Sequence, residues 1–181
     1  MSDLTLRMAR LRARLAEALA RRRVPLGYVL GAAAWWFASP TPRSLLVGAA
    51  VGAIGETLRI WAAGHLEKGR EVTSSGPYAL TRHPLYAGST IIGAGIAIAA
   101  NSLVVAALVL AYLGLTITAA IRSEEAYLTD KFGGHYPDYR DGRTAAGTRR
   151  FSLERAMRNR EYRALAGFVI VLALLAARRY R

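Results

Sequence analysis

Two short polar stretches contain the residues whose types and spacing are best suited to chemistry. The first carries an adjacent cationic pair, Arg82 and His83, and the second an adjacent anionic pair, Glu124 and Glu125. About 35 mostly apolar residues lie between them, and at ~1.5 Å per helical residue these suffice for two passes through a ~30 Å hydrocarbon layer. Two passes return the chain to the side that it left. The two pairs are therefore expected at one membrane face, an arrangement that suits a small zwitterionic ligand better than a pore or a structural anchor.

A proline directly follows the cationic pair and favours a helix start at that point. Pro84 has no N–H and a fixed φ, which suits the first turn of a helix. A helix start presents free N–H groups and a partial positive charge, so together with Arg82 it predicts an anion site at the membrane surface. Two plainer interpretations stay open. Arg82 would simply flank a span and reach toward headgroups, and the glutamates would form a solvated helix face that balances Arg122 and Lys131.

Two further charged residues fall inside an apolar segment. Glu56 and Arg59 are three positions apart, so they share one face of a helix. Because an unpaired charge near the bilayer centre is costly, we expect the two side chains to pair or to face a polar cavity. Arg59 is expected near the cytoplasmic end of its helix. Both a functional and a purely structural role for such a pair stay open.

The segment that follows the cationic pair has few bulky side chains. Gly88, Gly93 and Gly95 thin the expected helix just below the charged cluster. Small residues in a membrane helix favour close packing against a neighbouring helix. They also allow a flat ring or a ligand backbone to approach the main chain. The sequence is compatible with either role.

Membrane helices must position these residues, and the apolar segments predict where the helices lie. The fold class expected is all-α, a polytopic membrane helical bundle of about five transmembrane helices that follows an interfacial amphipathic helix at residues 4–22. The last apolar segment is short, so it is expected either as a tilted span or as a helix in the interface. The predicted spans are residues 25–37, 44–64, 85–100, 103–121 and 164–177.

The fourth span is expected to continue beyond the membrane. Good helix formers follow it as far as Phe132, and the first strong breaker is Gly133-Gly134. The two glutamates would then lie on a rigid extension just outside the bilayer. We treat the chain as a single membrane-embedded domain, 1–181, with a basic arm at 1–23, core motifs at 64–140 and an added C-terminal helix at 158–181.

The composition combines an apolar chain with a large positive charge. Of the 181 residues 53% are hydrophobic, yet the formal net charge is +13, because arginines crowd the N-terminus and the region after the glutamates. This segregation is typical of a multi-spanning protein whose basic regions are cytoplasmic, and we expect a bacterial inner membrane with the site facing the cytoplasm. The basic runs lack interleaved base-stacking aromatics, so anionic lipid headgroups, and not nucleic acid, are the expected partners. The chain has no cysteine, and its three histidines lack metal-ligand spacing, so no metal is expected.

Taken together, the two polar stretches resemble a known family. The residues that carry the similarity are Gly76-Pro77-Tyr78, Arg82 to Gly88, Glu124-Glu125, Leu128, Phe132-Gly133, Tyr136 and Tyr139. They are similar to those of the integral-membrane isoprenylcysteine carboxyl methyltransferases and their phospholipid N-methyltransferase relatives. The resemblance covers residues 64–140. It implies S-adenosylmethionine as methyl donor, bound near the cytoplasmic surface, and a lipophilic acceptor, a prenylcysteine-like carboxylate or a lipid amine, that enters from the bilayer.

The resemblance also implies roles for individual residues. We expect Arg82 and Glu125 to be catalytic, together with Arg59 and Glu56 of the preceding span. The sequence departs from the family after Tyr139, where an arginine–proline pair often closes the donor site, because Arg149-Arg150-Phe151 follow here without a proline. The residues expected to bind the donor are His83, Tyr86, Gly88, Gly93, Gly95, Glu124, Glu125, Leu128, Tyr136 and Tyr139.

Several questions stay open at this point. A membrane reductase of related architecture and a non-catalytic membrane adaptor are the alternative functions, although the chain is short for a dinucleotide site. A carboxylate acceptor needs no base, whereas an amine acceptor needs Glu124, Glu125 or a histidine to remove a proton. The sequence decides neither the acceptor nor the oligomeric state.

Overall fold

The structure, a computed structural model, describes residues 31–180 of the chain. The interfacial helix expected at residues 4–22 and the start of the span expected at 25–37 lie outside this part; residues 31–37 are helical. Among the described residues there is no strand, only an isolated parallel bridge between Ser75 and Gly147. The elements, in order, are α2 (Pro42–Ala63), the 3-10 helix η1 (Gly76–Ala79), α3 (Pro84–Ala100), α4 (Leu103–Phe132), α5 (His135–Arg140), α6 (Leu153–Arg158) and α7 (Tyr162–Arg178).

Short polar side chains and prolines fix where the long helices begin. At α2 the Thr41 hydroxyl accepts from the Ser44 N–H, the Ser44 hydroxyl accepts from the Thr41 N–H, and Pro42 occupies the first turn. Pro84 opens α3, as its sequence position predicts. The helices predicted at residues 44–64 and 85–100 are thus confirmed, with boundaries within two residues.

Helix α4 is the longest element and carries the glutamate pair to the end of the bundle. It runs for 30 residues without a break and stops at Gly133, whose φ of 54° ends the helix. At ~1.5 Å per residue the helix is roughly 45 Å long, more than a ~30 Å hydrocarbon layer requires. The predicted helical extension to Phe132 is therefore confirmed.

Helices α2 and α3 pack at backbone distance through glycines. A Cβ built on Gly48 would lie 2.4 Å from the Gly95 carbonyl oxygen, and one built on Gly55 would lie 2.6 Å from that of Gly88. Gly93 faces the other way, where a Cβ would lie 2.2 Å from the Leu113 side chain of α4. Neighbouring helices therefore fill the space beside these glycines, which is the first of the two roles considered for them, close helix packing.

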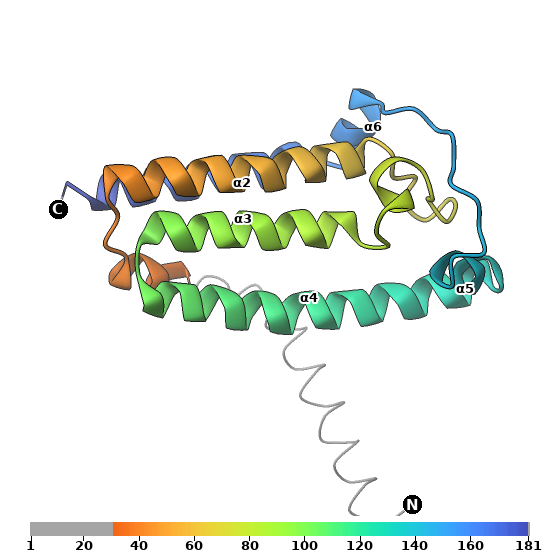
Figure 1. The fold of residues 1–181 in the computed structure, drawn as a ribbon, viewed down its shortest axis with the longest axis horizontal. Helices are drawn as coiled ribbons and strands as arrows, with labels where there is room; N and C mark the ends of the chain where they lie inside the picture. Colours follow the sequence, from red (N-terminus) through yellow and green to blue (C-terminus); the bar gives the residue numbers. More distant parts are fainter. Residues whose placement is uncertain (1–30, 181) are drawn as a thin grey trace, which may run out of the picture.

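The C-terminal helix lies along α2 instead of across the end of the bundle. Figure 1 shows the dark blue α7 behind α2, and its Phe168 ring occupies the space beside Gly52, where a Cβ would meet it at 2.2 Å. At its far end the Arg178 guanidinium donates to the carbonyl oxygens of Trp35 and Trp36, each at 3.2 Å. Helix α7 is therefore antiparallel to α2 and packed along its length.

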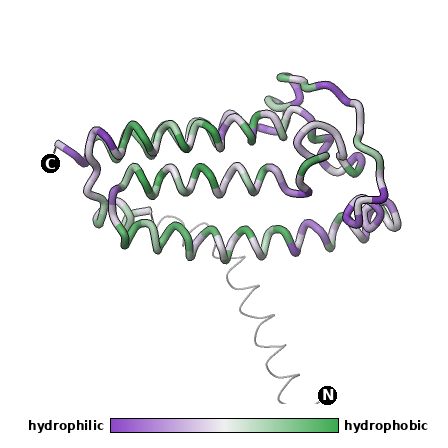
Figure 2. Tube along the Cα trace, in the orientation of Figure 1, coloured by the Kyte–Doolittle hydropathy of each residue, from purple (hydrophilic) through white to green (hydrophobic). Residues whose placement is uncertain are grey.

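Polarity divides the bundle into an apolar shaft and one hydrophilic end. Figure 2 shows mostly hydrophobic residues along α2, α3 and the first half of α4, and hydrophilic residues around α5 and the loops beside it. Among the described residues two helices, α2 and α4, are long and apolar enough to cross a membrane, while α3 is apolar but shorter. The expected count of five spans is therefore not reproduced. The outward side chains of Leu46, Leu110 and Leu115 are exposed, as a lipid-facing surface requires.

Candidate functional site

The candidate site lies at the hydrophilic end, where α3 begins, α4 ends and α5 packs beside it (Figure 1). His83 is the N-cap residue of α3, but its side chain does not cap the helix. Instead, its Nε2 lies 3.0 Å from Oε1 of Glu125 on α4. The Arg82 guanidinium approaches the same carboxylate oxygen at 3.6 Å. The predicted meeting of the cationic pair and the glutamates at one end of the hairpin is confirmed.

The short helix α5 adds two tyrosines whose rings lie 6.2 Å apart. The Tyr139 hydroxyl donates to the Tyr78 carbonyl oxygen at 2.6 Å, which ties α5 to η1. Burial raises the pKa of Tyr139 to about 12, against the opposing charge of Arg82. Tyr136 is 2% exposed, and its hydroxyl makes no hydrogen bond. Burial, then the charge of Glu125 and the approach of the hydroxyl to that carboxylate, raise the pKa of Tyr136 to about 12, so the hydroxyl keeps its proton and is directed at Glu125.

Of the other residues predicted to bind the donor, some lie at the same end of the bundle and two do not. The Tyr86 ring lies 5.8 Å from that of His83. Glu124 is half-buried, and after burial its charge contributes most to the raised pKa of Tyr78. Leu128 is half-buried one turn beyond them on α4. Gly88 begins the close contact with α2, whereas Gly93 and Gly95 lie deeper along α3, away from the charged cluster.

The expected pairing of Glu56 with Arg59 is wrong. Arg59 instead donates from Nε to Oε1 of Glu161, at the N-terminus of α7, at 2.5 Å. Its Nη1 donates to the Ser89 hydroxyl at 2.5 Å and to the Leu85 carbonyl oxygen at 3.3 Å. Glu56 is 3% exposed, and neither of its carboxyl oxygens has a hydrogen-bond partner. No local pattern indicates the Glu161 contact, because 102 positions separate the two residues.

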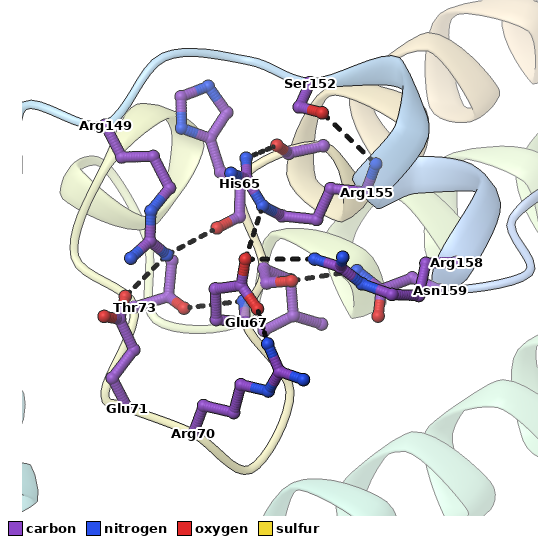
Figure 3. Close-up of polar contacts among 12 residues, drawn as sticks. His65, Glu67, Arg70, Glu71, Thr73, Arg149, Ser152, Arg155, Arg158 and Asn159 are labelled. Carbon is purple, nitrogen blue, oxygen red and sulfur yellow. Dashed lines mark hydrogen bonds and ion pairs between the residues drawn. The ribbon is translucent and has the colours of Figure 1, made fainter.

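A second polar cluster, which the sequence did not predict, joins residues 149–159 to the loop that follows α2 (Figure 3). Glu67 accepts from Arg155 Nε at 2.8 Å and from Arg158 at 3.1 Å, and the Arg155 hydrogen bond is the first cause of a lowered Glu67 pKa. Arg149 pairs with Glu71 at 2.6 Å. These arginines, expected only as a basic flank, hold the segment after α5 against the loop that precedes η1.

The buried side of this second cluster contains a histidine. His65 Nδ1 lies 3.1 Å from the Ser75 hydroxyl, and the ring covers Gly76, whose φ is 58°. A Cβ on Gly76 would lie 2.6 Å from the His65 ring, so glycine is required there for both backbone and space. Burial, and then the charges of Arg155 and Arg149, lower the pKa of His65.

A hollow lies between α3 and α4 in the apolar part of the bundle. Its volume is about 250 Å³ and its lining is mostly apolar. Thr90, at one end, donates its hydroxyl proton to the Tyr86 carbonyl oxygen at 3.0 Å, so this end lies one turn below the Tyr86 backbone. The lining residues are Thr90, Ala94, Ala97, Val109, Leu110, Leu113, Gly114, Ile117 and Thr118.

The arrangement is suited to a charged ligand with groups of both signs. Arg82 is half-exposed, and its 3.6 Å pair with Glu125 is a loose surface pair that a ligand carboxylate can replace at little cost. Glu125 and the half-buried Glu124 offer acceptors for an ammonium or for hydroxyls, and the unpaired Tyr136 hydroxyl offers a donor. Within residues 31–180 no group of three histidine, aspartate or glutamate side chains is placed to hold a metal ion. The residues present therefore fit S-adenosylmethionine, which carries a carboxylate, an ammonium and a ribose diol.

Comparisons with known proteins bear on the same region. The chain is 34% identical over 112 residues to the nickel-cobalt-cadmium resistance protein NccN of Alcaligenes xylosoxydans xylosoxydans. The aligned residues make up 59% of this chain and 52% of that protein. It is 32% identical over 89 residues to the cobalt-zinc-cadmium resistance protein CzcN of Cupriavidus metallidurans, covering 48% and 40%. The chain thus spans about half or less of the length of these curated relatives. No solved structure matches it.

A family model described as phospholipid methyltransferase matches residues 42–135. The match begins with α2 and runs through α3 and α4 to the start of α5, so it includes His83, Glu125 and the hairpin that brings them together. Because the match covers more than half of the chain and includes the resembling residues from Gly76 to Gly133, this protein belongs to the phospholipid methyltransferase family.

Proposed function

We propose that this protein transfers a methyl group from S-adenosylmethionine to a lipophilic acceptor at the cytoplasmic face of a bacterial inner membrane. The observation that carries the proposal is the junction of Arg82 and His83 with Glu125, beside the buried Tyr136 hydroxyl. Membership of the family supports a membrane methyltransferase. The substrate and the membrane face are parts of the proposal.

In this proposal the charged residues bind and orient the donor. Arg82 holds its carboxylate with support from the positive end of the α3 dipole, since a cation and a helix N-terminus favour an anion. Glu124 and Glu125 accept from its ammonium and its ribose hydroxyls, and Tyr136 donates a further hydrogen bond. When bound, the donor would supply a methyl group on its sulfonium: the acceptor would attack the methyl carbon in line as the carbon–sulfur bond breaks, and the demethylated thioether would leave. The protein's contribution is therefore positioning in a dry site more than acid–base chemistry.

The hollow between α3 and α4 provides the place for the acceptor. Its apolar lining suits a hydrocarbon chain, and its Thr90 end lies one turn of α3 below Tyr86. A chain lying there would place its polar end near the donor-binding residues. An acceptor of either chemistry, a carboxylate or an amine, fits this geometry.

The test is transfer of a labelled methyl group into lipid. The purified protein, reconstituted in vesicles of bacterial polar lipids, is given S-adenosylmethionine labelled on its methyl group, and label in the organic extract is counted. We expect label in the extract with the wild type and little with Arg82→Ala. Oxidation of NADPH without methyl transfer would instead indicate a reductase, and the absence of both activities would indicate an adaptor. Mass spectrometry of the labelled product then identifies the acceptor.

A further inference from the structure

The C-terminal helix contributes one side chain to the interior of the bundle near the candidate donor site. Glu161, the residue before α7, is 6% exposed and accepts the 2.5 Å hydrogen bond from Nε of Arg59. This glutamate lies outside residues 42–135, the part of the chain that the family model matches. A role of α7 as a mere additional anchor would not require a buried carboxylate at this position.

Arg59 connects Glu161 to the start of α3. While Nε bonds to Glu161, Nη1 bonds to the Ser89 hydroxyl and the Leu85 carbonyl oxygen. The arginine stem passes directly over Gly88, where a Cβ would lie 2.5 Å from Arg59 Cγ. The guanidinium thus bridges α7 to the first turns of α3, the stretch that also carries Tyr86.

Glu161 is the carboxylate that orients this guanidinium. Glu56, one turn earlier on α2, is buried as well, yet its oxygens make no hydrogen bond. The planar guanidinium has donors fixed in direction, so a carboxylate on Nε determines where Nη1 points. Without Glu161, Arg59 would be a half-buried cation with no hydrogen-bonded carboxylate, free to turn toward Glu56 and away from Ser89.

The position of Glu161 is itself fixed from both sides. Two residues before it, the Asn159 amide donates to the Ala63 and Leu66 carbonyl oxygens, both at 2.9 Å, at the end of α2. Seven residues after it, Phe168 fills the space beside Gly52. The backbone on each side of Glu161 is therefore held against α2, and the carboxylate is presented to Arg59 in a defined place.

We propose that Glu161 is a positioning residue of the donor site: it orients Arg59, which fixes the first turns of α3 and thereby the groups that bind S-adenosylmethionine. The inference rests on the proposed function, because it concerns the affinity for that donor. On this inference α7 contributes to donor binding through Glu161. Glu161 does not touch the donor; it acts through Arg59.

The test is a double-mutant cycle on donor affinity in lipid nanodiscs. Glu161→Gln keeps the size of the side chain and removes its charge, and we expect roughly tenfold weaker binding of S-adenosylmethionine. Arg59→Gln should weaken binding at least as much, and the double variant no more than Arg59→Gln alone, because Glu161 acts only through Arg59. Glu154→Gln, the same change at an exposed position of α6, should bind like the wild type. Equal affinity of the wild type and Glu161→Gln, or additive effects in the double variant, would overturn the proposal.

Two further measurements separate this inference from the proposed function. Amide hydrogen exchange without donor should be faster at residues 85–89 in Glu161→Gln than in the wild type and unchanged in Glu154→Gln. Unchanged exchange at residues 85–89 would refute the inference, whereas a wild type that binds no donor would refute the proposed function. Glu161→Asp keeps the charge, and we expect it to recover most of the affinity that Glu161→Gln loses. If Glu161→Gln does not fold, Arg59→Lys, which keeps the charge but not the Nε and Nη1 donors, should weaken binding in its place, and unchanged affinity would overturn the proposal.

Discussion

His83 at the start of α3 and Glu125 near the end of α4 are joined by a 3.0 Å contact between Nε2 and Oε1, although 42 positions separate them. The turn at Asn101 and Ser102 closes the hairpin at one end, and this contact closes it at the other. Because the same carboxylate oxygen also faces Arg82, the charged groups satisfy one another at the surface. The carboxylate of a zwitterionic ligand can replace Glu125 as the partner of Arg82, and its ammonium can replace Arg82 as the partner of Glu125. The ion pair therefore leaves the site open to such a ligand.

The buried hydroxyl of Tyr136 should matter for binding and not for folding. Tyr136→Phe removes a hydroxyl that approaches Glu125 without a hydrogen bond of ordinary geometry, so we expect the free energy of unfolding to change by less than about 0.5 kcal/mol. Affinity for S-adenosylmethionine should fall roughly three- to tenfold, the effect of one hydrogen bond. Tyr139→Phe is the matched control, because it loses the 2.6 Å bond to Tyr78 and should lower the stability by about 1 kcal/mol. Equal destabilisation by both changes would contradict a ligand-directed role for Tyr136.

The glycine contacts between α2 and α3 give a second prediction. Gly95→Ala places a Cβ 2.6 Å from the Gly48 carbonyl oxygen, and the backbone cannot yield without separating the helices. We expect a loss of about 1–3 kcal/mol in the free energy of unfolding, the range for an overpacked interior. Gly114→Ala has no atom within 4 Å of the new Cβ and should gain up to about 1 kcal/mol from helix propensity. Reversible unfolding in detergent measures both, and a neutral Gly95→Ala would mean that the helices are not in backbone contact.

The parts that the sequence predicted are those that depend on neighbours in the chain. The start of α3 follows from Pro84, and the end of α4 from Gly133. The proximity of His83 and Glu125 follows from the two consecutive apolar helices between them, which return the chain to the same end of the bundle. Contacts between distant segments left no local signal: the proximity of Glu56 and Arg59 suggested a pair, but the tertiary fold brought Glu161 to Arg59. The arginines that bind Glu67 likewise looked like an ordinary basic flank, because an arginine-rich segment gives no indication of which acids it will meet.

Acid should destabilise the cluster around His65 in a defined range of pH. Burial and the charges of Arg155 and Arg149 hold the pKa of folded His65 below its ordinary 6.5, so the unfolded chain binds more protons there. The stability from this group is therefore complete above about pH 6.5 and is lost as the pH falls through 6.5 toward the folded pKa. As the pH is lowered from about 7.5 to about 5.5, we expect the thermal unfolding midpoint of the wild type to decrease, and to decrease more steeply than that of His65→Gln. Equal slopes would show that His65 does not titrate on unfolding.

The sidedness of the hairpin can be tested with single cysteines, because the chain contains none. Leu80 and Thr144 are exposed near the charged end, and Leu103, 89% exposed, begins α4 at the other end. Cysteines at Leu80 and Thr144 should react with an impermeant thiol reagent from the cytoplasmic side only, and a cysteine at Leu103 from the opposite side only. Labelling of Leu80 and Thr144 from opposite sides would separate Arg82 from Glu125 by a bilayer and exclude a shared site.

Substitutions at the junction should weaken donor binding specifically. Arg82→Ala and Glu125→Gln each remove hydrogen bonds to charged groups, and each should cost about 1.5–3 kcal/mol of binding free energy. Arg43→Ala is the control, because Arg43 is exposed at the opposite end of α2 and should leave the affinity unchanged. Similar losses in all three variants would place the donor site elsewhere.

Calorimetry of the wild-type protein with S-adenosylmethionine, in lipid nanodiscs, tests the central claim most directly. The charged junction and the unpaired Tyr136 hydroxyl offer partners for the carboxylate, the ammonium and the ribose of the donor. We expect saturable binding of the donor and of its demethylated product in the micromolar range, about −8 kcal/mol, and weaker binding of NADPH. An absence of detectable heat at millimolar donor, with protein that remains folded, would contradict a methyltransferase site built from these residues.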